Sequence, residues 1–414
     1  MRRSRPRFPS WRQNRPQYQQ SYRPQSSQYQ QAQSSDVFDF LNLPESFPAM
    51  KQLIEDPILT PIIMERNQQL APSSADNFAL INFVTCIRQK LDALVLSPNS
   101  FAACQISEVR DVGSHKHNTI ILPPMGSHLT SDLVVVLKTL PTREAIDQLG
   151  NRLKQDFQNE IAPQQAACKF FYSSKEKKII LKKVVLSMKP TNDGLSLDNG
   201  TMAVHLLLTT LPANWHSLDP TIHLDRAMCK RNFNAIKHAK WVDEVCIHPS
   251  IKVLVRLLKD LRQRFRGLEP LNPWLINLLA HHCVTNNNST EQLPPSYAFK
   301  RALQLLSSGL FLPGFNGLYD PFSDANMHSS RSYTTMTLEE QDRLCYTSQT
   351  LLRALAIHPK YVLGIEHGPD IFAGPCQLNG VLFTPNEPIV FDTESNGYPI
   401  NDGQQQTMLV EVNS

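Results

Sequence analysis

Residues 111–139 read DVGSHKHNTIILPPMGSHLTSDLVVVLKT, and the order of residue types in this stretch predicts the fold of the first half of the chain. Gly113-Ser114 follows a polar segment, and after a loop containing Gly, Pro and Ser, Asp132 opens the apolar run Leu133–Leu137. A glycine-serine turn after one strand offers backbone N–H groups to phosphate, and a carboxylate that opens the next strand can hold Mg²⁺. Gly113, Ser114 and Asp132 are therefore candidate nucleotide-binding residues.

The acids needed for catalysis are missing from this pattern. Two-metal nucleotidyl transfer requires at least two carboxylates, and usually three, that converge on one point. Val134 lies two residues beyond Asp132 on the same face of the strand and cannot supply the second. The strand expected to carry the third, Met202–Thr210, has His205 as its one titratable group. A lone histidine in an apolar strand is typical of a hydrogen-bonded core residue, so we predict no catalytic residue and no metal site.

The charge of the chain is unevenly distributed. The 414 residues, enough for two lobes, carry a formal net charge of +4, but residues 1–35 hold seven arginines and no acid. The remaining residues carry a slight excess of acids, which excludes a nucleic-acid clamp that is basic throughout. The basic tail instead indicates a segment that contacts polyanions.

Residues 1–35 are rich in Arg, Gln, Pro, Ser and Tyr and have too little apolar surface to fold, so we predict a disordered tail. Arginine interleaved with tyrosine can pair with phosphate and stack on unpaired bases. The alternative is a solubilising tail or a nuclear-import signal. The RNA-contact candidates are Arg2, Arg3, Arg5, Arg7, Arg12, Arg15 and Arg23.

The eight cysteines are scattered without a Cys-x-x-Cys pair, which argues against a zinc ribbon or a disulfide framework and suits a reducing compartment. The start of the chain has no apolar signal region, and no apolar run approaches the length of a membrane span. We therefore expect a cytosolic or nuclear protein with no membrane partner.

The pattern changes from mixed α/β to helical at about Pro212. The expected divisions are a tail over 1–35, an arm over 36–75 that packs on the first lobe, an α/β lobe over 76–211, a helical lobe over 212–390 and a flexible tail over 391–414. In the α/β lobe we expect helices over 75–96 and 142–157 and strands over 133–137, 178–187 and 202–210, with a Gly- and Asp-containing loop between the last two.

In the helical lobe we expect helices over 224–242, 251–265, 274–284, 297–310 and 338–357. The last begins with a capping box at Thr337-Leu338-Glu339-Glu340. The helix over 251–265 also has a basic face, which either binds phosphates or is a solvated or partner-facing surface. That face contains Lys252, Arg256, Lys259 and Arg266.

Six stretches over about residues 60–390 resemble the DZF-domain family. They are RNQQLAP (66–72), EVRDVGS (108–114), DLVVVLK (132–138), KVLVRLLKDLR (252–262), GLFLPG (309–314) and MTLEEQD (336–342). The chain departs from the relatives in its Gln-, Tyr- and Pro-rich tail, in a longer loop over 114–132 and in an expanded segment over 170–199. The resemblance implies an α+β, template-free nucleotidyltransferase-like fold, similar to poly(A) polymerases and oligoadenylate synthetases, that has lost its catalytic acids.

The resemblance also implies a partner and a compartment. The partner is a DZF-domain protein with double-stranded-RNA-binding domains, of the interleukin-enhancer-binding factor three type, or a zinc-finger RNA-binding protein. RNA is then contacted mostly through the partner, in a nuclear complex that can shuttle to the cytoplasm and acts with RNA or DNA in transcription, RNA processing and translation. The interface candidates on the helical lobe are Leu310, Phe311, Leu312, Leu344 and Leu351.

Other functions remain open. Leu318–Pro321 resembles the Asp-Pro loop near the base in noncanonical poly(A) polymerases, which makes Asp320 a nucleotide-binding candidate, and the alternative is an ordinary turn. No cofactor is required, although ATP or UTP can bind without catalysis. The competing hypothesis is an active nucleotidyltransferase that combines Asp132 with another acid, such as Glu108 or Asp198.

Overall fold

The computed structural model describes residues 56–101, 103–124, 126–171, 187–285, 292–315, 317–322 and 336–385, with the backbone alone for 158–171 and 187–188. The predictions for the tails over 1–35 and 391–414 lie outside the described residues, as does most of the strand predicted over 178–187. Within the described helices, none is long and apolar enough to cross a membrane.

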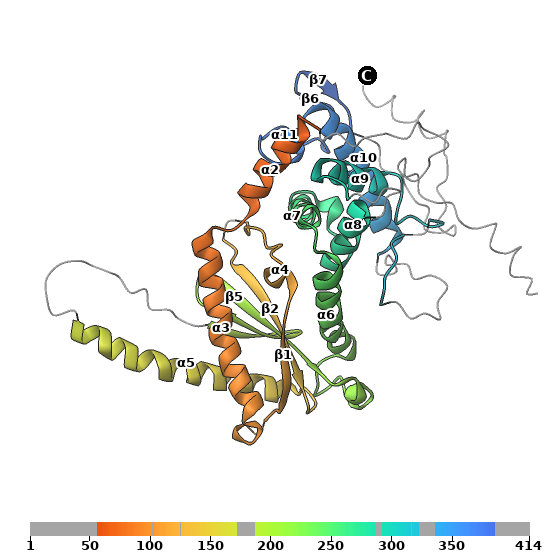
Figure 1. The fold of residues 1–414 in the computed structure, drawn as a ribbon. Coiled ribbons are helices and arrows are strands. Elements are labelled where there is room, and N and C mark those ends of the chain that lie inside the picture. The colour runs from red at the N-terminus through yellow and green to blue at the C-terminus, as the bar shows by residue number, and fades with distance from the viewer. Residues whose placement is uncertain are drawn as a thin grey trace, which may run out of the picture.

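A five-stranded mixed sheet forms the centre of the first lobe (Figure 1), in the order β1-β2-β5-β4-β3. Its strands are β1 (Ile106–Val112), β2 (Leu129–Leu137), β3 (Ser187–Thr191), β4 (Gly194–Asp198) and β5 (Met202–Thr210). β2 and β5 pair in parallel, and the other neighbours are antiparallel. The strand predicted over 133–137 is confirmed, although it begins four residues earlier.

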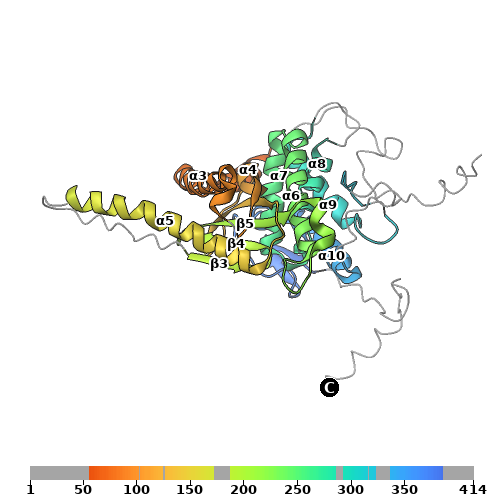
Figure 2. The same cartoon turned by 90° about the horizontal axis from the view of Figure 1, so that it is seen from below.

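Helices cover both faces of this sheet, which explains the continuous apolar run in β2. Alternate side chains of β2 point to opposite faces. Leu133 and Val135 pack with α3 (Ser74–Leu96) and α5 (Arg143–Phe171). Val134 and Val136 pack with α6 (Arg226–Val245) on the other face. Figure 2 shows α5 extending well beyond the sheet.

The position of α6 ties the two halves of the chain together. Ala235, Ile236 and Ala239 of this helix pack on β1, β2 and β5, so the predicted boundary after residue 211 would separate α6 from the sheet that it covers. At its other end α6 contacts α8 (Pro273–Thr285).

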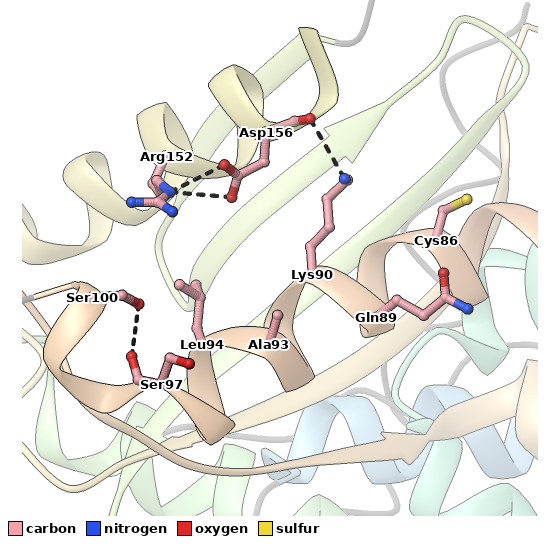
Figure 3. Close-up of a pocket in the computed structure, with 9 residues that line it drawn as sticks. All are labelled: Cys86, Gln89, Lys90, Ala93, Leu94, Ser97, Ser100, Arg152 and Asp156. Atoms are coloured by element: carbon pink, nitrogen blue, oxygen red, sulfur yellow. Dashed lines mark hydrogen bonds and ion pairs between the residues drawn. The ribbon is translucent and has the colours of Figure 1, made fainter. Parts of the chain in front are cut away.

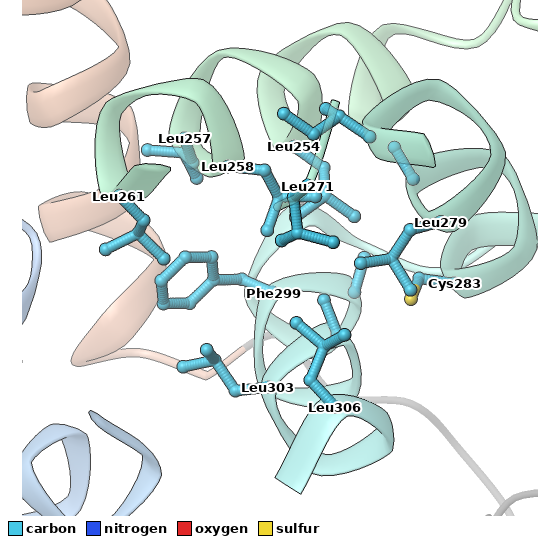
Figure 4. Close-up of a cluster of buried hydrophobic side chains, with 14 of the residues drawn as sticks. Leu254, Leu257, Leu258, Leu261, Leu271, Leu279, Cys283, Phe299, Leu303 and Leu306 are labelled. Atoms are coloured by element: carbon cyan, nitrogen blue, oxygen red, sulfur yellow. The ribbon is translucent and has the colours of Figure 1, made fainter. Parts of the chain in front are cut away.

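The second lobe is built around a large apolar core. Figure 4 shows leucines of α7 (Pro249–Arg264) packed against α8 and against Phe299 of α9 (Pro295–Ser307). The apolar face of α7 is buried in this core, with Leu254, Leu257, Leu258 and Leu261 all inaccessible. The helix starts at Pro249 and is capped by His248, whose Nδ1 accepts from the Ser250 backbone N–H.

The last part of the described chain completes this lobe. α10 (Leu338–Ile357) starts with the predicted capping box of Thr337 and Glu340. Beyond it lie α11 (Pro359–Val362) and a hairpin of β6 (Cys376–Leu378) and β7 (Val381–Phe383).

Two parts of the prediction are wrong. The arm contains a helix, α2 (Leu59–Leu70), which packs mainly on α7, α9 and α11 of the helical lobe, while only its end at Leu70 bonds to Leu122 of the first lobe. Pro61 is tolerated because it lies in the first turn, where backbone N–H groups have no intrahelical partner. The region predicted as a loop between two strands contains β4, because its turn residues Asn192 and Gly194 hid a five-residue strand.

Candidate functional site

The candidate nucleotide-binding residues meet in a cleft between the sheet and the helical lobe. The cleft has a volume of about 150 Å³ and is walled by α6, α7 and the start of α8. Its polar lining consists of Ser114, His117, Thr119, Asp132, His238, Lys259, Trp274 and Asn277.

Gly113 and Asp132 are packed directly against each other. Val112, the last residue of β1, pairs with Asp132, the fourth residue of β2, so the glycine-serine turn begins beside the carboxylate. Gly113 has a φ of +76°, and a Cβ at this position would lie 2.5 Å from Asp132 Oδ2. A glycine is therefore required here both by the backbone conformation and by the close approach of the carboxylate.

The positions expected to carry further metal ligands hold other groups. Val134 is completely buried beneath α6. His205 pairs with Asp132 across β2 and β5, and its Nδ1 lies 3.6 Å from Asp132 Oδ1. With 43% of its side chain exposed, His205 is not the core residue that the sequence predicted. The apolar pattern of the strand predicted burial of His205, but His205 and Leu207 on this face of β5 are only partly buried.

Lys259 of α7 is the polar centre of the cleft. Its Nζ donates to Ser114 Oγ at 2.6 Å, to the Thr119 carbonyl at 3.0 Å and to Thr119 Oγ1 at 3.2 Å. Burial lowers the pKa of Lys259 to about 7, and the nearby Asp132 opposes this shift. Desolvation raises the pKa of Asp132, which His205 and Lys259 partly offset.

The basic face predicted on α7 is therefore divided. Lys259 reaches the glycine-serine turn, and Arg256 donates to the Asn118 carbonyl and to Asn67 Oδ1. These two residues join the lobes instead of facing solvent. Lys252 lines a neighbouring cavity of about 130 Å³, and Arg266 lies exposed beyond the end of the helix. From the sequence, only the spacing of the basic residues along α7 could have indicated that Lys259 and Arg256 contact the first lobe.

The acids proposed as partners of Asp132 are engaged elsewhere. Glu108 forms an ion pair with Arg110 at 2.6 Å, and Asp198 lies 3.4 Å from His128. Neither is among the charged groups that shift the pKa of Asp132. Within the described residues, no three His, Cys, Asp or Glu side chains are arranged to hold a metal ion. Asp193 also raises the pKa of Asp132 through its charge, but its carboxylate is paired with Arg231 at 3.2 Å. One carboxylate paired with an arginine and another beside an ammonium group do not fit a pair of magnesium ions.

Asp320 does not line the cleft itself, but it contacts Trp274, which does. Its Oδ2 accepts a hydrogen bond of 3.1 Å from the indole N–H of Trp274. Trp274 in turn stacks on His238, with ring centroids 3.9 Å apart and planes 4° apart. Burial lowers the pKa of His238 to about 4, so this stack is uncharged at neutral pH.

The predicted interface residues are mostly inside the helical lobe. Leu310, Phe311, Leu344 and Leu351 are each at most 4% exposed, and only Leu312 is partly accessible. Their apolar character reflects the core of this chain, so they are not available to a partner. The arginines of the tail, from Arg2 to Arg23, lie outside the described residues.

A second hollow, of about 490 Å³, lies between α3 and α5 (Figure 3). Its charged groups are satisfied by one another: Arg152 donates to the Asp156 carboxylate at 3.1 Å, and Lys90 lies 3.5 Å from the Asp156 carbonyl. We assign no site to it.

Two family models cover most of the chain. The DZF N-terminal domain matches residues 27–246, and the DZF C-terminal domain matches residues 250–398. The chain belongs to the DZF family. The two DZF domains meet between residues 246 and 250, in the turn between α6 and α7, so the N-terminal DZF domain includes α6. The cleft lies between the two DZF domains, because Lys259 comes from the second and Ser114 from the first.

The DZF chain is also similar to three solved structures. Escherichia coli CdnC in complex with HORMA-deltaN matches with 15% identity and a TM-score of 0.47, over 74% of this chain and 94% of that one. The same enzyme with ATP matches with 13% identity and a TM-score of 0.46, over 74% and 95%. Vibrio cholerae DncV, a cyclic AMP-GMP synthase, matches with 9% identity and a TM-score of 0.43, over 72% and 90%. We draw no functional conclusion from similarities of this size.

Proposed function

We propose that this DZF chain is a non-catalytic, nucleotidyltransferase-like subunit that pairs with an RNA-binding DZF protein. The observation that carries the proposal is the replacement of the second carboxylate position by Val134, a fully buried side chain. A valine has no carboxylate with which to bind a metal ion, and this position is packed beneath α6.

The surroundings of Asp132 support the same conclusion. In its protonated form, Lys259 places a positive charge near the Asp132 carboxylate, where an active enzyme would place metal ions. The cleft, at about 150 Å³, is also smaller than the roughly 300–1,000 Å³ typical of small-molecule sites.

Catalysis is tested by incorporation of labelled nucleotide into RNA with Mg²⁺ or Mn²⁺. We expect the purified chain to incorporate no more label than Asp132→Ala. Incorporation that depends on the metal and disappears in Asp132→Ala would establish the competing hypothesis of an active enzyme.

Within the family, the sequence resembles interleukin-enhancer-binding factor two, the smaller subunit of a nuclear RNA-binding heterodimer. We infer that the chain is nuclear and that it acts in transcription, RNA processing or translation, with RNA bound mainly through its partner. The isolated chain should then be poorly soluble or self-associate, and co-expression with a DZF protein that carries double-stranded-RNA-binding domains should correct this. A monodisperse and stable monomer in isolation would contradict the inference.

Nucleotide binding without catalysis is a second candidate function, favoured by the contact of Lys259 with Ser114. An ammonium group and a glycine-serine turn are suited to phosphate. ATP or UTP should raise the melting temperature of the chain, because a ligand that binds only the folded state stabilises it. The rise should disappear in Ser114→Ala and persist in Ser100→Ala, which lies in the hollow between α3 and α5. Equal shifts in both variants would place the nucleotide elsewhere.

A further inference from the structure

A hollow of about 910 Å³ lies on the surface of the helical lobe, away from the cleft. It is bounded by the end of α7, by α10 and by the segment after α11. We call it the α7–α10 groove, and its lining is Arg264, Phe265, Arg266, Gly267, Glu339, Asp342, Arg343, Tyr346, Thr347, Tyr361, Gly368, Pro369, Asp370 and Phe372. This volume is sufficient for several residues of a bound peptide.

Asp342 is a buried carboxylate in the wall of this groove. The residue is 7% exposed, and its side chain makes no hydrogen bond or ion pair with any residue in the described part of the chain. Burial accordingly raises the pKa of Asp342. Buried polar groups in native proteins nearly always have a partner, and a buried charge without one is costly. Because Asp342 lines the groove, a ligand there can reach it.

Three aromatic rings lie beside this carboxylate. The ring centroid of Phe372 is 5.9 Å from that of Phe265 and 6.1 Å from that of Tyr346, with planes tilted by about 60°. Tyr346 follows Asp342 by one helical turn, so both project from the same side of α10. The guanidinium of Arg264 already lies 5.0 Å above the Phe265 ring. These rings therefore present faces to which a planar cation can stack.

The arginines of the groove do not neutralise Asp342. Arg264 donates to Asp260 Oδ2 and to the Val362 carbonyl. Arg343 is paired with Glu339. Arg266 is exposed. Among the described residues, the carboxylate of Asp342 thus has no ion pair, in a groove that is also lined by aromatic rings.

We propose that the α7–α10 groove binds an arginine side chain of a partner protein, with the guanidinium on Asp342 and stacked among Tyr346 and Phe372. A guanidinium satisfies both features at once, because it donates two parallel hydrogen bonds to a carboxylate and stacks on aromatic faces. The inference rests on the proposed function in one respect, namely that a protein partner supplies the arginine.

Peptide binding tests the groove without the partner. The dye-labelled full-length chain, at nanomolar concentration, is titrated with acetyl-Gly-Arg-Gly-amide and with its neutral citrulline counterpart by thermophoresis. We expect saturable binding of the arginine peptide that is at least tenfold weaker for citrulline and in Asp342→Asn. Glu269→Gln is the control, since it removes an exposed acid of the helical lobe that does not line the groove and should bind as the wild type does. Equal binding of both peptides, no binding, or equal binding of a lysine peptide would overturn the proposal.

Thermal unfolding of the isolated variant separates binding from a structural role. Because Asp342 has no partner among the described residues, Asp342→Asn should leave the melting temperature unchanged or raise it. A fall of several degrees would mean that the carboxylate supports the fold, and would overturn the proposal. Phe372→Leu supplies an independent check, because it should weaken the arginine peptide severalfold while keeping the charge of Asp342. Failure to form a heterodimer would instead concern the proposed function, since no partner is present in these measurements.

Discussion

Gly113 and Asp132 are adjacent in space because the end of β1 pairs with the head of β2. The glycine has a φ of +76°, and an added Cβ would meet the Asp132 carboxylate. Gly126 has a similar φ of +85°, but an added Cβ there would meet nothing within 4 Å. Substituting each glycine by alanine therefore separates two free-energy costs. Gly126 reports the cost of the backbone conformation alone, and Gly113 adds the cost of the close approach to Asp132.

We predict that Gly126→Ala lowers the free energy of unfolding by about 1–2 kcal/mol, the cost of a left-handed non-glycine residue. Gly113→Ala should cost at least about 1 kcal/mol more, because the carboxylate must also move. In the Asp132→Ala background this excess should shrink, since neighbouring substitutions are not additive. Urea unfolding of the four variants and the wild type measures each term, and equal costs at the two glycines would refute the close contact.

Lys259 makes stability depend on pH. Burial lowers its pKa to about 7 from an ordinary value of 10.5, so between these pH values the unfolded chain carries a proton that the folded chain lacks. Stability should therefore rise with pH across this window because of Lys259. In Lys259→Met the rise between pH 7 and pH 10 should be smaller, as measured by chemical unfolding at each pH. An identical pH profile in the two proteins would mean that Lys259 is not buried in this way.

At the scale of single elements, local sequence signals were the most dependable where they concern helix starts. Ser73 caps α3, and its Oγ accepts from the Asp76 backbone N–H at 3.1 Å. The capping box of α10 is complete: Thr337 Oγ1 accepts from the Glu340 N–H at 3.2 Å, and Glu340 accepts from the Thr337 N–H at 2.8 Å. These bonds join residues three apart, so no distant contact is needed to form them.

Thr337→Ala should destabilise the chain by about 1 kcal/mol through the loss of this cap. Thr337→Ser keeps the hydroxyl and should lie close to the wild type. Because α10 carries Asp342 and Tyr346, fraying of its first turn should also weaken binding of the arginine peptide in the α7–α10 groove. Differential scanning calorimetry of both variants checks the first expectation, and equal melting temperatures would show that the cap contributes little.

At the scale of the whole molecule, α7 contacts both lobes and the helix α2 of the arm. Lys259 and Arg256 contact the first lobe. Asp260 accepts from Arg66 of α2 at 2.7 Å and from Arg264 at 2.9 Å, and Arg264 reaches the segment after α10. The cleft and the α7–α10 groove thus lie at different parts of one helix.

The tail provides a prediction about the complete chain. If the seven arginines of residues 1–35 contact RNA, deleting this segment should weaken RNA affinity more at low salt than at high salt, because counterion release carries such contacts. Binding curves of the full-length and truncated chains at several salt concentrations measure this. A loss that is independent of salt would contradict a role for the arginines.

Local patterns explain which parts were predictable. Apolar runs and caps indicated β2, β5, α3 and α10, since burial repeats along one element with a fixed period. β4 was missed because its flanking glycine and asparagine resemble a loop. The prediction that His205 is a core residue was wrong, because the order of apolar residues along a strand does not show where the helix that covers it ends.

The sequence by itself determined the α+β order of elements, the glycine-serine turn before Asp132 and the absence of the further acids from β2 and β5. These properties depend on neighbouring residues and on composition along single strands. Only the tertiary structure decided that Lys259, 145 residues away, bonds to Ser114 and that α2 packs on the helical lobe. It also decided that Asp342 is buried with no partner in the part of the chain that the structure describes. The reason is that such contacts follow from how whole elements pack, which no local period of side chains records.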